Sequence, residues 1–172
     1  SLRVAQDRRP RYDSRMRQSE ALDLLKLGHN VFLTGAAGSG KTYVLNNYIS
    51  YLREHDVAHA VTASTGIAAT HLGGVTIHSW SGIGVRDTLT DGEIDHFAEK
   101  NKRAARIRDA RVLVIDEISM LHAHQLDLID RICRRSRESL RPFGGLQIAL
   151  CGDFFQLPPV SRGDAPVRYV FA

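Results

Sequence analysis

Cysteine and long apolar runs are scarce in this chain, and each scarcity excludes a class of protein. Only two cysteines, Cys133 and Cys151, occur among 172 residues, too few for the disulfide framework of a small secreted protein. No apolar run approaches the ~18 residues that indicate a membrane-spanning helix, which excludes a transmembrane protein. The start of the sequence also lacks a secretory signal. We therefore expect an intracellular, reducing compartment and no membrane partner.

Positive charge is concentrated at the start of the chain. The sequence has 23 lysines and arginines against 19 aspartates and glutamates, a net charge of +4. Residues 1–17 hold six of the arginines and two of the aspartates, so they account for the whole excess. We interpret residues 1–15 as a basic leader that either touches nucleic acid or stays solvated. Residues 16–172 have the length and composition of one globular domain.

Short apolar runs alternate with helical patterns along this domain. Runs such as 112–115 are apolar at every position, which is typical of strands buried on both faces. Helical patterns follow, for instance over 41–54 and 122–137. The alternation predicts an α/β fold, a mostly parallel sheet with helices on both faces. Residues 86–110 are polar and rich in charge, and we expect them to form one or two exposed helices inserted into the domain.

The segment 35–42, Gly-Ala-Ala-Gly-Ser-Gly-Lys-Thr, matches the phosphate-binding pattern G-x-x-x-x-G-K-[ST], known as the P-loop or Walker A motif. The glycines let backbone amides converge on phosphate groups, and the following helix points its positive end at the same place. Lys41 can then reach the β- and γ-phosphates of a nucleoside triphosphate, and the Thr42 hydroxyl can bind Mg²⁺. The other expected phosphate contacts are Gly35, Ala36, Ala37, Gly38, Ser39 and Gly40.

An acidic pair, Asp116 and Glu117, follows the apolar run at 112–115 as a Walker B motif. A buried parallel strand delivers such residues to the carboxyl edge of the sheet, where α/β proteins bind ligands. Asp116 would hold Mg²⁺ directly or through water, and Glu117 is the natural base for the attacking water. Combined with segment 35–42, this pair indicates a nucleoside triphosphate hydrolase.

The identity of the base is indicated less directly. The guanine pattern N-K-x-D is missing after Asn101, so adenine is preferred. Gln18 is a candidate for the base edge, because its amide both donates and accepts hydrogen bonds; the other interpretation is an ordinary exposed residue at a helix start. Gln156, within 152–159, lies where an amide could sense the γ-phosphate or its attacking water. A surface loop that ends in proline is an equally good interpretation of that segment.

Five segments together resemble the PIF (petite integration frequency) family of superfamily 1 DNA helicases, in the group that translocates 5′ to 3′. Two of them, 35–42 and 115–120, occur in many P-loop families. The discriminating segments are Thr-Ala-Ser-Thr-Gly-Ile-Ala-Ala at 62–69 and Gly-Val-Thr-Ile-His-Ser-Trp at 74–80. The fifth is Gly-Asp-Phe-Phe-Gln-Leu-Pro-Pro-Val at 152–160. The resemblance covers nearly the whole chain.

The resemblance implies a RecA-like domain that binds ATP and Mg²⁺, in an ATP-dependent helicase of the kind used in DNA repair and recombination. Gln18 looks like the family's adenine-contacting glutamine. Lys41, Glu117 and Gln156 look like its catalytic residues. Such an enzyme would work in the cytoplasm of a bacterium, or in the nucleus or mitochondrion of a eukaryote.

Single-stranded DNA is the partner that the resemblance implies. The residues that look like the family's contacts to the DNA backbone are Thr65, Gly66, Thr76 and His78. Small residues and free amides suit close approach of a phosphodiester backbone. His78 taken alone is better interpreted as a polar core residue, and Trp80 as a packed residue. Residues 75–77 are expected to be extended, and 79–84 to be rich in turns.

The family's motor has two RecA-like domains with ATP between them, and the second supplies arginines to the γ-phosphate. Because the chain ends shortly after 152–160, we expect this second domain to be absent from the 172 residues. The chain should then bind MgATP, hydrolyse it poorly and fail to unwind a duplex. The inserted segment 86–110 falls where the family carries a small wedge subdomain. Its basic residues would guide DNA or form a solvated helix.

Two other functions remain open. One is a stand-alone P-loop ATPase or loader module that does not translocate. The other is a fragment without enzymatic activity that docks on a partner through the basic leader and an arginine cluster. The arginines of that cluster are Arg131, Arg134, Arg135, Arg137 and Arg141.

Overall fold

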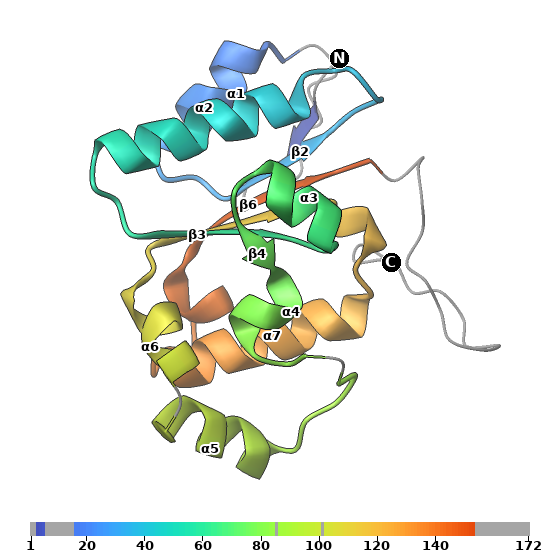
Figure 1. The fold of residues 1–172 in the computed structure, drawn as a ribbon. Coiled ribbons are helices and arrows are strands. Elements are labelled where there is room, and N and C mark those ends of the chain that lie inside the picture. Colours follow the sequence, from blue (N-terminus) through green and yellow to red (C-terminus); the bar gives the residue numbers. More distant parts are fainter. Residues whose placement is uncertain (1–2, 6–15, 85, 101, 154–172) are drawn as a thin grey trace, which may run out of the picture.

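The computed structural model describes residues 3–5, 16–84, 86–100 and 102–153 of the chain (Figure 1). Its centre is a six-stranded sheet in the order β1-β2-β6-β5-β3-β4. Neighbouring strands are parallel except for the edge pair β1 and β2. The predicted α/β fold with a mostly parallel sheet is thereby confirmed. The strands are β1 (Arg3–Ala5), β2 (Val31–Thr34), β3 (His59–Ala63), β4 (Val75–Thr76), β5 (Val112–Asp116) and β6 (Gln147–Gly152).

Helices cover both faces of this sheet, and β5 shows how one strand serves both. Val112 and Val114 belong to an apolar cluster with α1 and α2. Leu113 and Ile115 belong to a second cluster, which contains residues of α7. Successive side chains of a strand point to opposite faces of the sheet. A strand that is apolar at every position therefore contributes side chains to the apolar cluster on each face. The helices are α1 (Gln18–Lys26), α2 (Lys41–Glu54), α3 (Gly66–His71), α4 (Ile77–Ser81), α5 (Asp91–Lys100), α6 (Lys102–Asp109) and α7 (Ala123–Ser136), with short 3-10 turns η1 (Ile118–Met120) and η2 (Pro142–Gly145). Among the described residues, no helix is both long and apolar enough to cross a membrane.

Two local features differ from the sequence expectations. Part of the expected basic leader forms strand β1, in which Val4 pairs with Leu33. Residues 77–81 form helix α4 instead of continuing an extended segment into turns. The Thr76 hydroxyl accepts a hydrogen bond from the Ser79 amide at 3.2 Å, which starts this helix, and Gly82 ends it with a left-handed φ of +83°.

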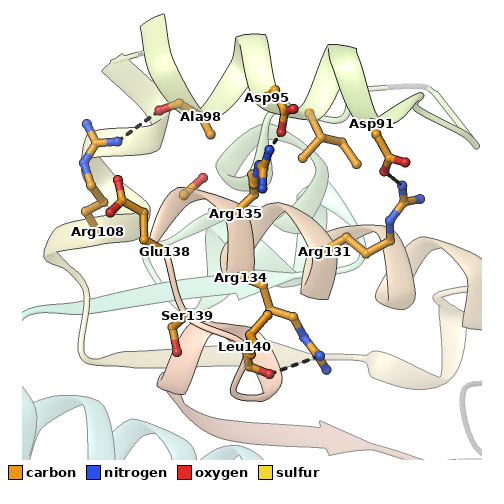
Figure 2. Close-up of a pocket in the computed structure, with 12 residues that line it drawn as sticks. Asp91, Asp95, Ala98, Arg108, Arg131, Arg134, Arg135, Glu138, Ser139 and Leu140 are labelled. Carbon is orange, nitrogen blue, oxygen red and sulfur yellow. Dashed lines mark hydrogen bonds and ion pairs between the residues drawn. The ribbon is translucent and has the colours of Figure 1, made fainter.

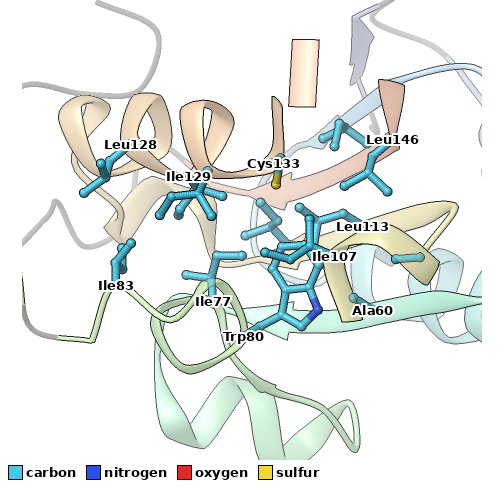
Figure 3. Packing of buried hydrophobic residues seen from close by; sticks show 14 of the residues in the cluster. Ala60, Ile77, Trp80, Ile83, Ile107, Leu113, Leu128, Ile129, Cys133 and Leu146 are labelled. Atoms are coloured by element: carbon cyan, nitrogen blue, oxygen red, sulfur yellow. The ribbon is translucent and has the colours of Figure 1, made fainter. Parts of the chain in front are cut away.

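Trp80 is a packing residue, as its sequence context suggests. Its side chain lies beside Ile107 and Leu113 in the cluster between the sheet and α7 (Figure 3). Only 4% of Trp80 is exposed, which leaves no face free for stacking on a base.

The inserted segment, expected to form one or two exposed helices, forms two, α5 and α6, and both pack against α7. Ile94 of α5 and Ile107 of α6 are buried in the α7 cluster. Ion pairs add to this contact: Arg131 of α7 binds Asp91 at 2.6 Å, and one turn along Arg135 binds Asp95 (Figure 2).

Arg137, just beyond α7, fixes the end of the insert. Its Nη1 donates to the carbonyl oxygens of Ile107, Arg108 and Ala110 at 2.7–2.9 Å. Its Nε donates to the carbonyl of Gly144 at 2.9 Å. The last carbonyls of a helix have no hydrogen-bond donor within that helix. The half-buried Arg137 guanidinium supplies donors to carbonyls at the end of α6, and it also binds a carbonyl of η2.

Candidate nucleotide and nucleic-acid site

The phosphate loop and the acidic pair lie at the same edge of the sheet. The loop follows β2, whose last residue, Thr34, pairs with Gly152 of β6. On the other side of β6, β5 runs parallel and ends at Asp116. The carboxyl ends of three neighbouring strands therefore carry residues 35–41, Asp116 and Asp153.

The loop keeps a conformation that only glycine tolerates at position 40. Gly40 has a φ of +88°, and a Cβ there would lie 1.9 Å from Nε2 of Gln18. That Nε2 donates to the carbonyl oxygen of Ser39 at 3.3 Å. Gln18 is thereby held against the loop from the start of α1.

Lys41 bends back over its own loop. Its ammonium Nζ donates to the carbonyl oxygens of Gly35 at 2.7 Å and Ala36 at 3.1 Å. The hydroxyl of Ser39 is buried and has no hydrogen-bond partner within the described part of the chain. A buried hydroxyl without a partner is costly, so the loop offers a polar group that a phosphate could satisfy.

A cleft of about 580 Å³ opens beside the loop. Its lining combines apolar and polar side chains, including Met16, Gln18, Leu22, Tyr43 and Asn47. The Tyr43 side chain is largely exposed and follows Thr42 in the first turn of α2. An apolar wall with a few amide groups is the usual lining of a site for a flat heterocycle.

The acidic pair is held by backbone contacts at the end of β5. Asp116 is 8% exposed, and its Oδ1 accepts the Glu117 amide at 2.9 Å. Glu117 has a left-handed backbone, with φ of +52°, which is uncommon for a residue other than glycine. Ser64 binds both residues: its amide donates to the Asp116 carbonyl at 3.1 Å, and its hydroxyl to the Glu117 carbonyl at 2.8 Å.

The pKa of the Glu117 carboxyl depends on its burial and on the charges around it. Its pKa is raised, chiefly by burial and then by the negative charges of Asp116 and Asp153, while Lys41 acts in the opposite direction. The same four groups therefore meet at one place. A carboxylate with a raised pKa is a better proton acceptor near neutral pH, provided that it stays ionised.

Sequence reasoning missed two neighbours of Asp116. Asp153 is 4% exposed directly after β6, and the sequence analysis assigned it no role. The Cys151 thiol is buried and hydrogen-bonded to the Asp116 side chain, and burial raises its pKa well above the ordinary value. The signal that could have found both is their position at the carboxyl end of a buried strand.

The four expected DNA contacts lie on adjoining segments of this edge. Ala63 of β3 pairs with Asp116 on one side and with Thr76 on the other. Thr65 begins α3 by accepting the Ala68 amide at 3.3 Å, and Gly66 is exposed at its first turn. His78 is half-buried in α4. Its pKa is lowered, mainly by burial, against the opposing effects of a Gln125 hydrogen bond and the Asp87 charge.

The family model described as PIF1-like helicase matches residues 16–171. The chain belongs to the PIF1-like helicase family. The expected resemblance to this family is therefore confirmed, across nearly the whole chain. All of the segment 152–160 after residue 153, including Gln156, lies outside the described residues, so the place of that glutamine within the family's site stays a prediction.

Relatives within the family are named as ATP-dependent DNA helicases. The chain is 58% identical over 151 residues to the Pif1 helicase of Psychrobacter, covering 87% of this chain and 23% of the relative. It is 45% identical over 163 residues to PIF1 of Saccharomyces cerevisiae, covering 90% and 18%. The chain thus spans a quarter or less of the length of these curated relatives.

Solved PIF1-family structures share the fold. The crystal structure of Pif1 helicase from Candida albicans superposes with a TM-score of 0.82 at 41% identity, covering 90% of this chain and 35% of that one. A Bacteroides Pif1 bound to single-stranded DNA gives a TM-score of 0.68 at 39% identity, covering 86% and 34%. A Bacteroides Pif1 in complex with ADP-AlF4 gives 0.69 at 38% identity, covering 85% and 33%.

Proposed function

We propose that this chain is the first RecA-like motor domain of an ATP-dependent 5′-to-3′ DNA helicase. One observation carries the proposal: the phosphate loop, the acidic pair and the segment 62–80 adjoin at a single sheet edge. Because the nucleotide contacts and the DNA contacts lie on neighbouring strand ends, a change in the bound nucleotide can be transmitted to the DNA over a short distance. The names of the Psychrobacter and Saccharomyces cerevisiae relatives, both ATP-dependent DNA helicases, support the same function.

In this proposal the loop holds the triphosphate. Lys41 exchanges the carbonyls of Gly35 and Ala36 for the β- and γ-phosphates, and the Ser39 hydroxyl gains an acceptor. Thr42 and Asp116 bind Mg²⁺, which neutralises phosphate charge. Glu117 orients the attacking water and accepts its proton. Gln18 contacts the adenine edge from the neighbouring cleft.

The DNA contact is proposed along Thr65, Gly66, Thr76 and His78. Both threonines begin short helices, where first-turn amides have no partner within the helix. Such amides suit phosphate oxygens of a single strand and carry no base preference. The Bacteroides relative described as bound to single-stranded DNA supports this partner.

The complete motor requires more than the described residues supply. We propose that a second RecA-like domain closes over the ATP and provides an arginine to the γ-phosphate, a contribution worth about 10³–10⁵ in rate in related reactions. Gln156 would sense the γ-phosphate in that closed state. DNA as substrate places the enzyme inside the cell: in bacterial cytoplasm, or in a eukaryotic nucleus or mitochondrion.

The alternative function, docking on a partner protein through the arginine cluster, has less support than the helicase function. Arg131, Arg134 and Arg135 bind Asp91, Asp130 and Asp95, and Arg137 binds four backbone carbonyls. These charges are used within the fold and offer little to a partner.

The test measures MgATP turnover with and without a poly-thymidine oligonucleotide, for the complete protein and for the 172-residue chain. We expect strong stimulation in the complete protein and slow turnover in the chain alone. Lys41→Ala should lower turnover at least about 100-fold, as loss of a charge-stabilising group does. Lys26→Ala is the matched control, because that exposed lysine lies over the Tyr51 ring, away from the loop. Equal turnover with and without DNA would favour a stand-alone ATPase.

A further inference from the structure

Ser64 connects the end of β3 to the acidic pair at the end of β5. Its backbone amide donates to the carbonyl oxygen of Asp116 at 3.1 Å, and its hydroxyl donates to the carbonyl oxygen of Glu117 at 2.8 Å. The first contact continues the parallel pairing of the two strands, in which Ala63 pairs with Asp116. The second contact is made by a side chain, so it depends on which residue occupies position 64.

Glu117 needs such a contact because its backbone is in an uncommon conformation. Its φ and ψ are +52° and +41°, in the left-handed region that residues other than glycine rarely adopt. Its amide donates to Oδ1 of Asp116 at 2.9 Å, and its carbonyl accepts the Met120 amide at 3.0 Å as well as the Ser64 hydroxyl. Because the direction of a side chain depends on its backbone, these contacts also determine where the Glu117 carboxyl lies.

The residues that follow Ser64 are the proposed contacts to DNA at the start of α3. The Thr65 hydroxyl accepts the Ala68 amide at 3.3 Å, and Gly66 is exposed in the first turn of the helix. Ser64 itself is half-buried. A single peptide bond therefore links Thr65, which would lie against the DNA backbone, to the residue whose hydroxyl holds Glu117.

We propose that Ser64 is a positioning residue for ATP hydrolysis: its hydroxyl holds the Glu117 backbone in the orientation that hydrolysis requires, and DNA bound at Thr65 and Gly66 strengthens this contact. Single-stranded DNA would then raise the rate of hydrolysis without changing how ATP is bound. The proposal rests on the proposed function, because it presupposes that Glu117 is the base and that DNA contacts the start of α3. A base must lie within hydrogen-bond reach of the attacking water, so a small displacement of its backbone lowers the rate.

A hydroxyl with a purely structural role would have a different effect. The chain beyond Glu117 also packs on β6, where a Cβ at Gly152 would lie 2.9 Å from Cγ2 of Ile118. If that packing alone fixed the Glu117 backbone, removal of the Ser64 hydroxyl would lower the stability and leave turnover by the folded protein unchanged. A positioning role instead lowers kcat in the presence of DNA and leaves the KM for ATP unchanged.

The experiment measures MgATP turnover by the complete protein and by Ser64→Ala, with and without a saturating poly-thymidine oligonucleotide. We expect Ser64→Ala to lower kcat in the presence of DNA about 3- to 10-fold, as loss of one ordinary hydrogen bond does. Turnover without DNA should fall less, so the stimulation by DNA decreases. The KM for ATP and the Kd for a fluorescent poly-thymidine oligonucleotide should not change. Ser64→Thr, which keeps the hydroxyl, should recover most of the loss.

Tyr48→Phe is the matched control, because it also removes a hydroxyl that joins two separate elements. The Tyr48 hydroxyl of α2 donates to Oε1 of Gln147, the first residue of β6, at 2.9 Å. This contact lies at the amino end of that strand, so Tyr48→Phe should leave the stimulation by DNA unchanged. Circular dichroism shows which variants fold. If Ser64→Ala does not fold, Ser64→Cys takes its place, because a thiol is of similar size and is only a weak donor.

The outcomes keep the inference and the proposed function apart. If DNA does not stimulate the natural protein, the proposed function fails, and this inference fails with it. If DNA stimulates the natural protein and Ser64→Ala by the same factor, the proposed function stands and Ser64 is a structural residue. The inference is also overturned if Ser64→Thr is as impaired as Ser64→Ala, or if the loss lies in the KM for ATP.

Discussion

The carboxyl edge of the sheet and the outer surface of α7 are both dense in charge, but they use that charge differently. On α7, Arg131 and Arg135 bind carboxylates of α5. At the sheet edge, the Lys41 ammonium binds backbone carbonyls, and Glu117 has a raised pKa beside other acids. Opposite charges come from the fold in the first region. In the second region, acidic side chains lie near one another and, among the described residues, the lysine binds only carbonyls, so a ligand would supply the missing partners of these charges.

This difference teaches that a run of charged residues does not by itself indicate a binding site. Residues 131–141 hold five arginines, while the phosphate loop and the acidic pair hold none. Yet the side chains of four of them are engaged within the molecule: Arg131, Arg134, Arg135 and Arg137. What distinguishes the site is that, among the described residues, the fold gives its charged groups no close partner of opposite charge: the Lys41 ammonium binds backbone carbonyls, and the Glu117 carboxyl, whose pKa is raised, lies near the charges of Asp116 and Asp153. Such features cluster where function is paid for with stability.

The largest effect that separates the two regions is expected from Glu117→Gln. Turnover should fall about 10²–10⁴-fold, the contribution of a general base, while affinity for MgATP is retained. Because the raised pKa disfavours the ionised carboxyl in the folded state, Glu117 costs stability above its folded pKa. This cost fades as the pH falls through the folded pKa and is gone below the ordinary pKa. Glu117→Gln should therefore unfold at the same or a higher temperature near neutral pH.

Turnover assays and thermal unfolding at pH 7.5 would check this pair of results, with exposed Glu54→Gln as the matched control. The acidic limb of the pH–rate profile should also lie above the range of an ordinary carboxyl. A Glu117→Gln variant that loses MgATP binding, or that melts well below the natural chain, would contradict the assignment.

Arg137 tests the opposite region, where charge supports structure. Arg137→Met keeps much of the side chain's apolar stem but removes the donors to the carbonyls of Ile107, Arg108, Ala110 and Gly144. Leaving half-buried carbonyls unsatisfied should lower the free energy of unfolding by about 3 kcal/mol, with no change in affinity for MgATP.

Urea unfolding followed by circular dichroism measures this loss. Exposed Arg141→Met serves as the control and should cost less than about 0.5 kcal/mol, as surface substitutions do. Hydrogen exchange should accelerate in α6 first. A loss for Arg137→Met no larger than that of the control would show that its four contacts contribute little.

The sequence predicted the elements that local pattern determines. The helix expected over 41–54 has these bounds in the structure, and the apolar run at 112–115 lies in strand β5, because glycines and apolar runs mark these elements. The short helix α4 was missed, since its cap, Thr76, also fits an extended segment. Strand β1 was missed because its register depends on the free edge of β2, a long-range feature that charge does not reveal.

The candidate site divides in the same way. Segment 35–42 and the pair Asp116 and Glu117 are local motifs, so the sequence was enough to place them together. The contacts of Cys151 and Ser64 join segments far apart in the chain. No spacing rule reaches across such distances, and only the fold brings these residues to the site.

The smallest effect is expected from the ion pair between Arg131 and Asp91, which shows how little the charges on the outer surface of α7 contribute to stability. A double-mutant cycle with Arg131→Gln and Asp91→Asn should give a coupling of about 0.2–1 kcal/mol, falling as salt rises from 0.05 to about 0.5 M. The reason is exposure: 93% of the Asp91 side chain is accessible, so water replaces the guanidinium at little cost. The buried Ile94 should hold α5 in place throughout, and Ile94→Ala should cost more than the whole cycle. A coupling above about 2 kcal/mol would show instead that the pair is shielded from water and that charge, rather than apolar contact, fixes the insert on α7.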